Sequence, residues 1–399
     1  MESLKELYKI GNGPSSSHTM GPKKAAERFA ERCHDADAYR VTLYGSLAAT
    51  GKGHLTDAAI LSVLASLAPT EIVWKPEVVL PFHPNGMLFE GLKGDEVVDS
   101  WTIYSVGGGA LANEASRLET PRSIYPLSTI SEIKEWCYHE GKTFWEYVSD
   151  CEGPEIWDYL DTVWETMCAT IQRGLNNDGV LPGGLKVARK ASTYWVKSKS
   201  YTDSLSSRAK IYAYALATSE ENASGGTVVT APTCGSSGVM PAVLYHLSTS
   251  RNFLRIRILR ALATAGLFGN VAKTNSSISG AEVGCQGEVG VACAMAAAAA
   301  CQLFGGTPSQ IEYAAEMGLE HHLGLTCDPV CGLVQVPCIE RNAIAAARAF
   351  DANAYATLSD GSHMVSFDKV VEVMNETGHA LPSLYRETSE GGLAKRFKR

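Results

Sequence analysis

The sequence predicts an α+β protein, in which an N-terminal α/β domain with a small sheet is followed by an all-helical domain. Short runs of β-branched and aromatic residues are confined to roughly the first 115 residues. From about residue 161 onward, nearly every periodic segment repeats its apolar residues at helical spacing. Glycine-rich breaks separate these helical segments. We place the boundary after residue 130, which gives domains 1–130 and 131–399.

Strands and helices alternate in the first domain. A helix is predicted after Pro22, and another over 54–67. The pair Asn85-Gly86 stands directly before an apolar run and predicts a hairpin turn. Alternating or β-branched runs predict strands at 40–47, 71–75, 86–90 and 96–106.

The second domain is predicted to contain only helices. They begin in the polar and aromatic segment 116–160. The most apolar segment, 289–304, is rich in alanine rather than leucine and is preceded by Glu288. It therefore indicates a buried helix rather than a membrane span. The other long helical segments are 201–224, 251–268 and 308–324.

The composition is that of an ordinary globular protein and excludes some classes of function. The chain has 399 residues, of which 45% are hydrophobic and 20% are charged. The net charge of −8 argues against a nucleic-acid-binding protein, which shows a basic face. The first 13 residues contain no apolar run, so we expect no secretory signal. Eleven cysteines, an odd number, fit the reducing cytoplasm.

The segment Ser15-Ser16-Ser17-His18-Thr19 precedes the first predicted helix. Hydroxyl side chains at such a place can simply cap the helix. Hydroxyls and exposed backbone N–H groups also make a site for a carboxylate, and a histidine beside them can exchange a proton with a ligand.

The loop Gly51-Lys52-Gly53-His54 stands before the helix predicted at 54–67, which we expect Thr56 or Asp57 to cap. Glycines let the backbone approach a ligand, and His54 is a candidate base, although a single histidine is also common as a structural residue. A phosphate-binding loop of the Walker type is excluded, because its Lys-Ser/Thr ending is absent.

Three cysteines stand in separate settings and form no Cys-x-x-Cys pair: Cys285 in VGCQGE, Cys327 in LTCDP and Cys338 in QVPCIERN. Three thiolates can hold an iron–sulfur cluster and leave one iron open as a Lewis acid. The alternative hypothesis is that the three cysteines are buried thiols that bind no metal. Adjacent His321 and His322 lack the spacing of a zinc protease.

A polar loop of small residues begins at Lys273 and leads into the alanine-rich segment. Such a loop is unusual unless it binds something. We therefore count Lys273, together with Asn85, as candidate substrate-binding residues.

Together the motifs resemble the bacterial iron–sulfur-dependent L-serine dehydratases. The matching strings run in family order from residue 9 to residue 394, so the resemblance covers nearly the whole chain. They are GNGPSSSHTMGP, LYGSLAATGKGHLTD, NNDGVLPGGL, EENASGG, VVTAPT, SISGAEVGCQGEVGVACAMAAAA, GLEHHLGLTCDPV, LVQVPCIERNA, VSFDKVVEVMNETG and YRETSEGGLA.

The resemblance implies an enzyme that converts L-serine to pyruvate and ammonia with a 4Fe-4S cluster and without pyridoxal phosphate. It implies a beta-type α/β first domain and a helical catalytic domain. Cys285, Cys327 and Cys338 would ligate the cluster, and the open iron would bind the 3-hydroxyl of serine. Substrate would also bind to Ser15, Ser16, Ser17 and Thr19, with His54 or His18 as the base. We expect a homodimer whose partner is the small-molecule substrate, with no nucleic acid and no membrane.

Two departures from the family pattern leave questions open. Cys234 stands where relatives commonly have the asparagine of APTNG, and no cysteine follows Cys338. We therefore expect no tail thiolate on the fourth iron, unless Cys234 or Cys331 takes that position. The same chemistry on threonine or cysteine is one alternative. A non-catalytic cluster protein that senses oxygen or iron is the other, but it leaves the serine and glycine loops unexplained.

Overall fold

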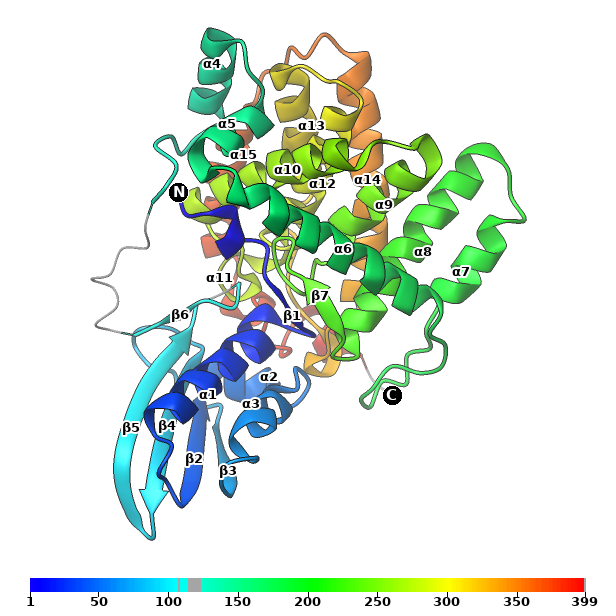
Figure 1. The fold of residues 1–399 in the computed structure, drawn as a ribbon. Coiled ribbons are helices and arrows are strands. Elements are labelled where there is room, and N and C mark those ends of the chain that lie inside the picture. The colour runs from blue at the N-terminus through cyan, green and yellow to red at the C-terminus, as the bar shows by residue number, and fades with distance from the viewer. Residues whose placement is uncertain (107, 114–122, 398–399) are drawn as a thin grey trace.

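A computed structural model describes residues 1–106, 108–113 and 123–397 (Figure 1). A sheet domain, drawn in blue and cyan, lies against a larger helical domain, which confirms the predicted α+β class (Figure 1).

The sheet domain contains a mixed five-stranded sheet with strand order β3-β2-β4-β5-β6. β3 pairs with β2 in parallel, and the other neighbours are antiparallel. Helices α1 (Gly21–Arg32) and α3 (Thr56–Leu64) pack on each other and cover one face of the sheet (Figure 1). The strands are β2 (Ala38–Tyr44), β3 (Thr70–Lys75), β4 (Gly86–Lys93), β5 (Glu96–Ser105) and β6 (Leu111–Ala112).

The four strands predicted from the sequence are present, but the hairpin predicted at Asn85-Gly86 is wrong. β3 and β4 are not neighbours in the sheet, so no turn joins them directly. Gly86 is instead the first residue of β4, where a Cβ would lie 2.6 Å from Leu80 Cδ1. The glycine serves close packing there rather than a turn, and Asn85 is buried.

Helix α12 (Val289–Leu303) is the centre of the helical domain. All of its side chains except Gln302 are buried. Four helices pack around it: α9 (Val239–Arg251), α10 (Arg255–Asn275), α13 (Pro308–Glu320) and α14 (Cys338–Leu358). Its small side chains permit close approach, because a Cβ at Gly318 of α13 would lie 2.9 Å from Ala294 Cα. The predicted burial of this segment is therefore confirmed.

The remaining helical domain contains both long and short helices. They are α4 (Ile130–Glu140), α5 (Phe144–Glu152), α6 (Glu155–Leu175), α7 (Ala191–Ser198), α8 (Asp203–Ala223), α9 (Val239–Arg251), α10 (Arg255–Asn275), α11 (Gly280–Val283), α13 (Pro308–Glu320), α14 (Cys338–Leu358), α15 (Phe367–Ala380) and α16 (Gly392–Arg396). Among the described residues, no single helix is long and apolar enough to span a membrane. The bent pair of helical segments Gly280–Gln286 and Val289–Leu303 is long and apolar enough when the two are taken together, by length and composition alone.

The chain begins inside the helical domain rather than in the sheet domain. Leu4, Leu7 and Tyr8 are buried in the helical core, whereas the core of the sheet domain begins at Ala25. Strand β1 (Ile10–Asn12) then pairs antiparallel with β7 (Thr227–Val229) of the helical domain. The first residues of our predicted domain 1–130 therefore pack with the second domain.

Candidate active site between the two domains

The serine-rich segment forms a tight turn at the start of α1. Ser16–Met20 is a short π-helical turn, and Ser15 caps it by accepting the His18 N–H at 3.1 Å. The Ser15 N–H in turn donates to Thr19 Oγ1 at 3.1 Å. All of these residues except Met20 are buried, so the turn presents its side chains to the interior of the protein.

Two threonines fasten this turn to the loop that carries His54. Thr19 Oγ1 donates to the His54 carbonyl at 2.7 Å, and Thr56 Oγ1 donates to the His18 carbonyl at 2.6 Å. The prediction that Thr56 or Asp57 caps α3 is wrong, because α3 follows Leu55 at φ 55° without a side-chain cap. The Thr56 hydroxyl holds the neighbouring loop instead, so each histidine is positioned by a threonine of the other loop.

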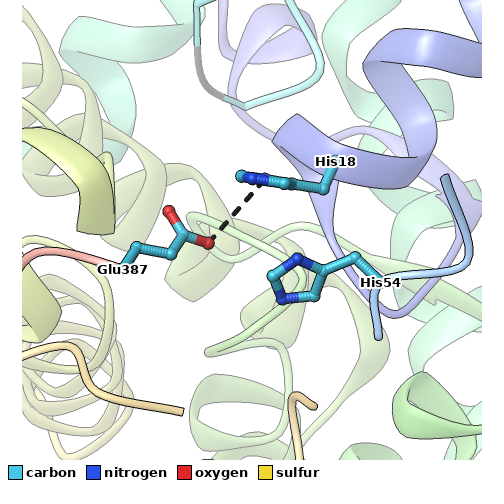
Figure 2. Close-up of side chains that lie close together, drawn as sticks. All are labelled: His18, His54 and Glu387. Atoms are coloured by element: carbon cyan, nitrogen blue, oxygen red, sulfur yellow. Dashed lines mark ion pairs between the residues drawn. The ribbon is translucent and has the colours of Figure 1, made fainter. Parts of the chain in front are cut away.

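The two histidine rings lie 4.6 Å apart between their centroids, but their nitrogens are engaged differently (Figure 2). His18 is hydrogen-bonded at both nitrogens, to Ser17 Oγ at 2.9 Å and to Ser46 Oγ at 3.1 Å. His54 Nδ1 contacts Thr50 Oγ1 at 3.2 Å, whereas its buried Nε2 has no hydrogen-bond partner among the described residues.

Burial favours the neutral form of both rings. It lowers the pKa of His54 to about 4. Burial also lowers the pKa of His18 well below its usual value, and the neighbouring His54 adds to the shift. A neutral ring with an unoccupied nitrogen can accept a proton at pH 7, and His54 Nε2 meets both conditions.

Glu387 reaches the histidines from the C-terminal segment (Figure 2). Its Oε1 lies 3.8 Å from His18 Nδ1, and its backbone N–H donates to the Cys327 carbonyl at 2.8 Å. Burial raises the pKa of this carboxyl to about 7, and the Cys285 thiolate adds to the shift. Sequence reasoning missed Glu387, for which the string YRETSEGGLA was the only signal.

The three predicted cysteines converge beside this group. Cys285 stands in the turn after α11, Cys327 in the loop before α14, and Cys338 begins α14. All three are free thiols. Ligand atoms of Cys285, Cys327 and Glu288 lie within 4.8 Å of one another.

Electrostatics distinguish Cys285 from the other two thiols. A hydrogen bond from the Cys327 thiol, and then the Arg341 guanidinium, lower the pKa of Cys285 to about 6. Burial, followed by the Cys285 charge, raises the pKa of Cys338. A set of three converging thiols with a thiolate-stabilising arginine suits a soft metal group such as an iron–sulfur cluster.

Glycines keep the space around the thiols open. A Cβ at Gly280 would lie 2.8 Å from Glu288 Oε2 and 3.1 Å from Cys327 Sγ. A Cβ at Gly53 would lie 2.6 Å from the Gly332 carbonyl, so the loop of His54 touches the loop between Cys327 and Cys338. The candidate site therefore lies between the domains, with histidines from one and cysteines from the other.

The other predicted residues differ in where they lie. The Ser16 hydroxyl has no hydrogen-bond partner within the described part of the chain. The Asn85 amide donates to the Ser105 carbonyl at 3.3 Å, and its buried Oδ1 has no hydrogen-bond partner in the parts of the chain that the structure describes. Lys273 Nζ pairs with Glu2 at 2.6 Å and donates to the Glu6 carbonyl at 3.3 Å, so among the described residues it contacts the N-terminal segment rather than the histidines or the cysteines.

The two further cysteines that we considered for the fourth iron have opposite settings. Cys234 is buried, with its Sγ 3.3 Å from Met20 Sδ. Cys331 is exposed and stands at φ 56° in the loop before Cys338. Sequence reasoning gave no role to Ser46, Glu288 or Arg341, because isolated polar residues carry no spacing signal.

Known proteins match the chain along its whole length. The family model for the serine dehydratase alpha chain matches residues 92–394, and that for the beta chain matches residues 3–73 and 67–116. L-serine dehydratase 1 of Escherichia coli is 43% identical, with 99% of each chain covered. The L-serine dehydratase of Streptomyces coelicolor is 42% identical, with 98% of each chain covered. That of Helicobacter pylori is 37% identical, with 99% of each covered.

The beta-chain matches cover the sheet domain, and the alpha-chain match begins at the end of β4 and covers β5, β6 and most of the helical domain, so the two overlap at residues 92–116. Matches of this length and identity leave one conclusion: the chain belongs to the serine dehydratase family.

Proposed function

We propose that this protein is an L-serine dehydratase, which converts L-serine to pyruvate and ammonia. One observation carries the proposal: the unoccupied His54 Nε2 and the Glu387 carboxylate lie beside three converging thiols at the interface of the two domains. Relatives that match the full length of the chain and bear this name support the same reaction.

We further propose that Cys285, Cys327 and Cys338 hold a 4Fe-4S cluster and that no pyridoxal phosphate is used. Their free thiols are a suitable donor set for such a cluster, and the nearby Arg341 stabilises the thiolate form of Cys285. When bound, the cluster would supply an iron without a fourth cysteine, which acts as a Lewis acid toward the 3-hydroxyl.

The residues around the thiols would perform the proton chemistry. His54 Nε2 takes the proton from Cα of serine, and the hydroxyl leaves from C3. The resulting 2-aminoacrylate becomes an imine, and water hydrolyses it to pyruvate and ammonia. His18 cannot serve as the base in this arrangement, because both of its nitrogens are hydrogen-bonded.

The serine-rich turn would bind the substrate carboxylate. The N–H groups of Ser16 and Ser17 and the Ser16 hydroxyl have no acceptor among the described residues, so they can donate to a carboxylate, whereas the Ser15 and His18 N–H groups are used within the turn. Ser15 and Ser17 shape the turn through their mutual contact at 3.3 Å. Thr19 acts through the His54 loop, because its hydroxyl is committed to the His54 carbonyl.

An assay of pyruvate formation tests the proposed reaction. Protein purified and reconstituted without oxygen should form pyruvate from L-serine, with L-threonine and L-cysteine as comparison substrates. Faster turnover of threonine or cysteine would assign the same chemistry to another substrate. Absence of turnover with all three would favour a non-catalytic sensor.

Replacement of single cysteines tests the cluster ligands. Cys285→Ala, Cys327→Ala and Cys338→Ala should each lose most of the iron and the cluster absorbance after anaerobic reconstitution, since each removes a thiolate ligand. Cys331→Ala is the matched control, because this exposed thiol lies in the same loop, and it should retain the cluster. Full cluster retention in any of the three variants would remove that residue from the ligand set.

We also propose a cytoplasmic homodimer without nucleic-acid or membrane partners. Large apolar side chains stand exposed at the end of α14 and in the loop after it, at Leu358 and Met364. Burial of such side chains against a second copy would be favourable. Light scattering should give twice the mass of one chain, and a monomer at micromolar concentration would contradict the proposal.

A further inference from the structure

We infer that Glu387 binds the α-ammonium group of the substrate and so restricts the site to α-amino acids. This inference rests on the proposed function, because it assigns one group of the substrate to one side chain of the same site. Recognition by Glu387 would exclude 2-hydroxy acids and N-acylated amino acids, which carry no ammonium group.

The Glu387 carboxylate lacks a donor. Its side chain is only 10% exposed, yet no hydrogen bond reaches its carboxylate oxygens within the described residues. Among the described residues, the one basic side-chain nitrogen within 4 Å of it is His18 Nδ1 at 3.8 Å, which belongs to a neutral ring and is already hydrogen-bonded to Ser17. No lysine or arginine of the described chain forms an ion pair with Glu387. A buried carboxylate without a donor is costly, so its position calls for a ligand that brings one.

The backbone holds this carboxylate in place at some cost. Glu387 has φ 57°, which is unfavourable for a residue with a side chain. Its N–H is fixed on the Cys327 carbonyl, and the Ser389 hydroxyl, two residues on, donates to the Pro329 carbonyl at 2.8 Å. These bonds hold the segment in a conformation in which the Glu387 side chain lies in the site rather than in solvent.

A metal ion is the main rival occupant, since His18, His54 and Glu387 have ligand atoms within 4.8 Å of one another. A metal would need a free nitrogen on each histidine, but His18 has none. An ammonium group needs no nitrogen ligand. It offers three N–H donors and a positive charge, which match a carboxylate without donors.

The position of Glu387 agrees with the other proposed contacts. Its carboxylate faces the His18 and His54 rings (Figure 2), and its backbone N–H donates to the Cys327 carbonyl. An amino acid bound there can place its carboxylate on the turn, its ammonium on Glu387 and its Cα proton toward His54. The three groups on one α-carbon would then have three separate partners.

Binding of two non-reacting ligands separates this role from a structural one. L-alanine and L-lactate differ only in an ammonium against a hydroxyl, and neither carries the 3-hydroxyl that leaves. Calorimetric titration of the anaerobically reconstituted wild type should give at least 10-fold tighter binding of L-alanine, since a hydrogen bond to a charged group is worth about 10- to 100-fold. Glu387→Gln should lose that preference by weakening L-alanine and leaving L-lactate unchanged.

Two further variants complete the test. Glu387→Asp keeps the charge at a shorter reach and should retain part of the preference. Glu390→Gln, an exposed change in the same segment, should bind both ligands as the wild type does. The cluster absorbance of each variant reports whether it is correctly assembled.

Several outcomes would overturn the inference. They are a wild type that does not prefer L-alanine, an equal loss of both ligands in Glu387→Gln, and an unchanged preference in that variant. The proposed function fails separately, if the wild type forms no pyruvate from L-serine. An enzyme that turns over serine but shows any of the three outcomes loses only the role of Glu387.

Discussion

His54 and His18 lie ring against ring, and their different hydrogen bonds predict different responses to mutation. His54→Ala should lower kcat by about 10²-fold or more, because a positioned general base contributes on that order. His18→Ala should also lower turnover, since it removes the ring against which His54 packs. Both variants should keep the cluster, as neither side chain is a proposed ligand. Pyruvate formation and cluster absorbance are the measurements.

Chemical rescue distinguishes the two histidines. Added imidazole can replace a missing base but not a missing packing partner, so it should restore part of the turnover of His54→Ala and none of that of His18→Ala. His34→Ala, an exposed change, is the control. Near-normal turnover of both site variants would make these histidines structural residues.

Residues with a distinctive local string were predictable, and residues brought in by folding were not. His18, His54 and the three cysteines stand in polar or glycine-rich strings that a buried structural segment does not need. Glu387 stands 341 positions from Ser46, whose hydroxyl nevertheless lies 3.5 Å from its carbonyl. A glutamate in a polar terminal string looks solvated, because nothing local shows that it is buried.

At the scale of elements, the threonine pair joins the serine-rich turn to the loop of His54. Thr19→Val removes a buried hydrogen bond to the His54 carbonyl and should cost about 1–3 kcal/mol of stability. Thr56→Val should cost a similar amount through the His18 carbonyl. Both should lower kcat, because the histidines lose their positions, and Thr19→Val should also raise KM, because the Ser15 N–H of the serine-rich turn loses its acceptor.

The double variant tests whether the two bonds act as one unit. The combined loss of stability should be smaller than the sum of the single losses, since either change already loosens both loops. Thr162→Val, in an exposed turn of α6, is the control and should change neither stability nor turnover. Strict additivity of the two site variants would show that the loops are held independently.

Elements with a clear period were predictable, and elements that depend on tertiary contacts were not. The strand pattern of 96–106 predicted β5, and the apolar spacing of 54–67 predicted α3. The prediction of a hairpin at Asn85 was wrong because Asn85, a residue type common in turns, is here buried and hydrogen-bonded to the Ser105 carbonyl. The π-helical turn at Ser16–Met20 has no period of its own, since five residues make barely one turn.

At the scale of the whole molecule, buried neutral histidines make the fold sensitive to acid. Burial, followed by the charges of Lys210 and Arg251, lowers the pKa of His246 to about 4. The unfolded chain binds this proton near pH 6.5, so unfolding takes up a proton between pH 6.5 and 4. The free energy of unfolding should therefore fall as pH falls through that window, by up to about 1.4 kcal/mol per pH unit for each such histidine.

Melting temperatures at pH 7 and pH 5 test this linkage. The decrease in Tm between the two pH values should be smaller in His246→Gln than in the wild type, since the variant lacks the histidine that takes up a proton on unfolding. His139→Gln, at an exposed position of α4, should keep the wild-type decrease. Equal decreases in all three proteins would show that His246 does not contribute.

The order of strand and helix patterns along the chain predicted the two domains, but it did not predict which segments pack in each domain. Met1–Tyr8 precede the sheet domain in sequence and pack in the helical core, which no local pattern announces. The alignment with the Escherichia coli relative also runs over 451 positions, more than the 399 residues of this chain. The two matches to the beta-chain model overlap at residues 67–73, which include the first residues of the edge strand β3.

The chain packs in the helical core both before and after it forms the core of the sheet domain. The sheet domain is therefore connected to the helical domain at both of its ends. A domain held by one connection can move away in any direction, whereas a second covalent connection limits how far the two faces can separate. Any opening that admits a substrate to the interface is therefore limited in extent, and the histidines stay near the cysteines. A cut in the segment after β6 would leave the first attachment in place, and the two halves of the site would keep a high effective concentration.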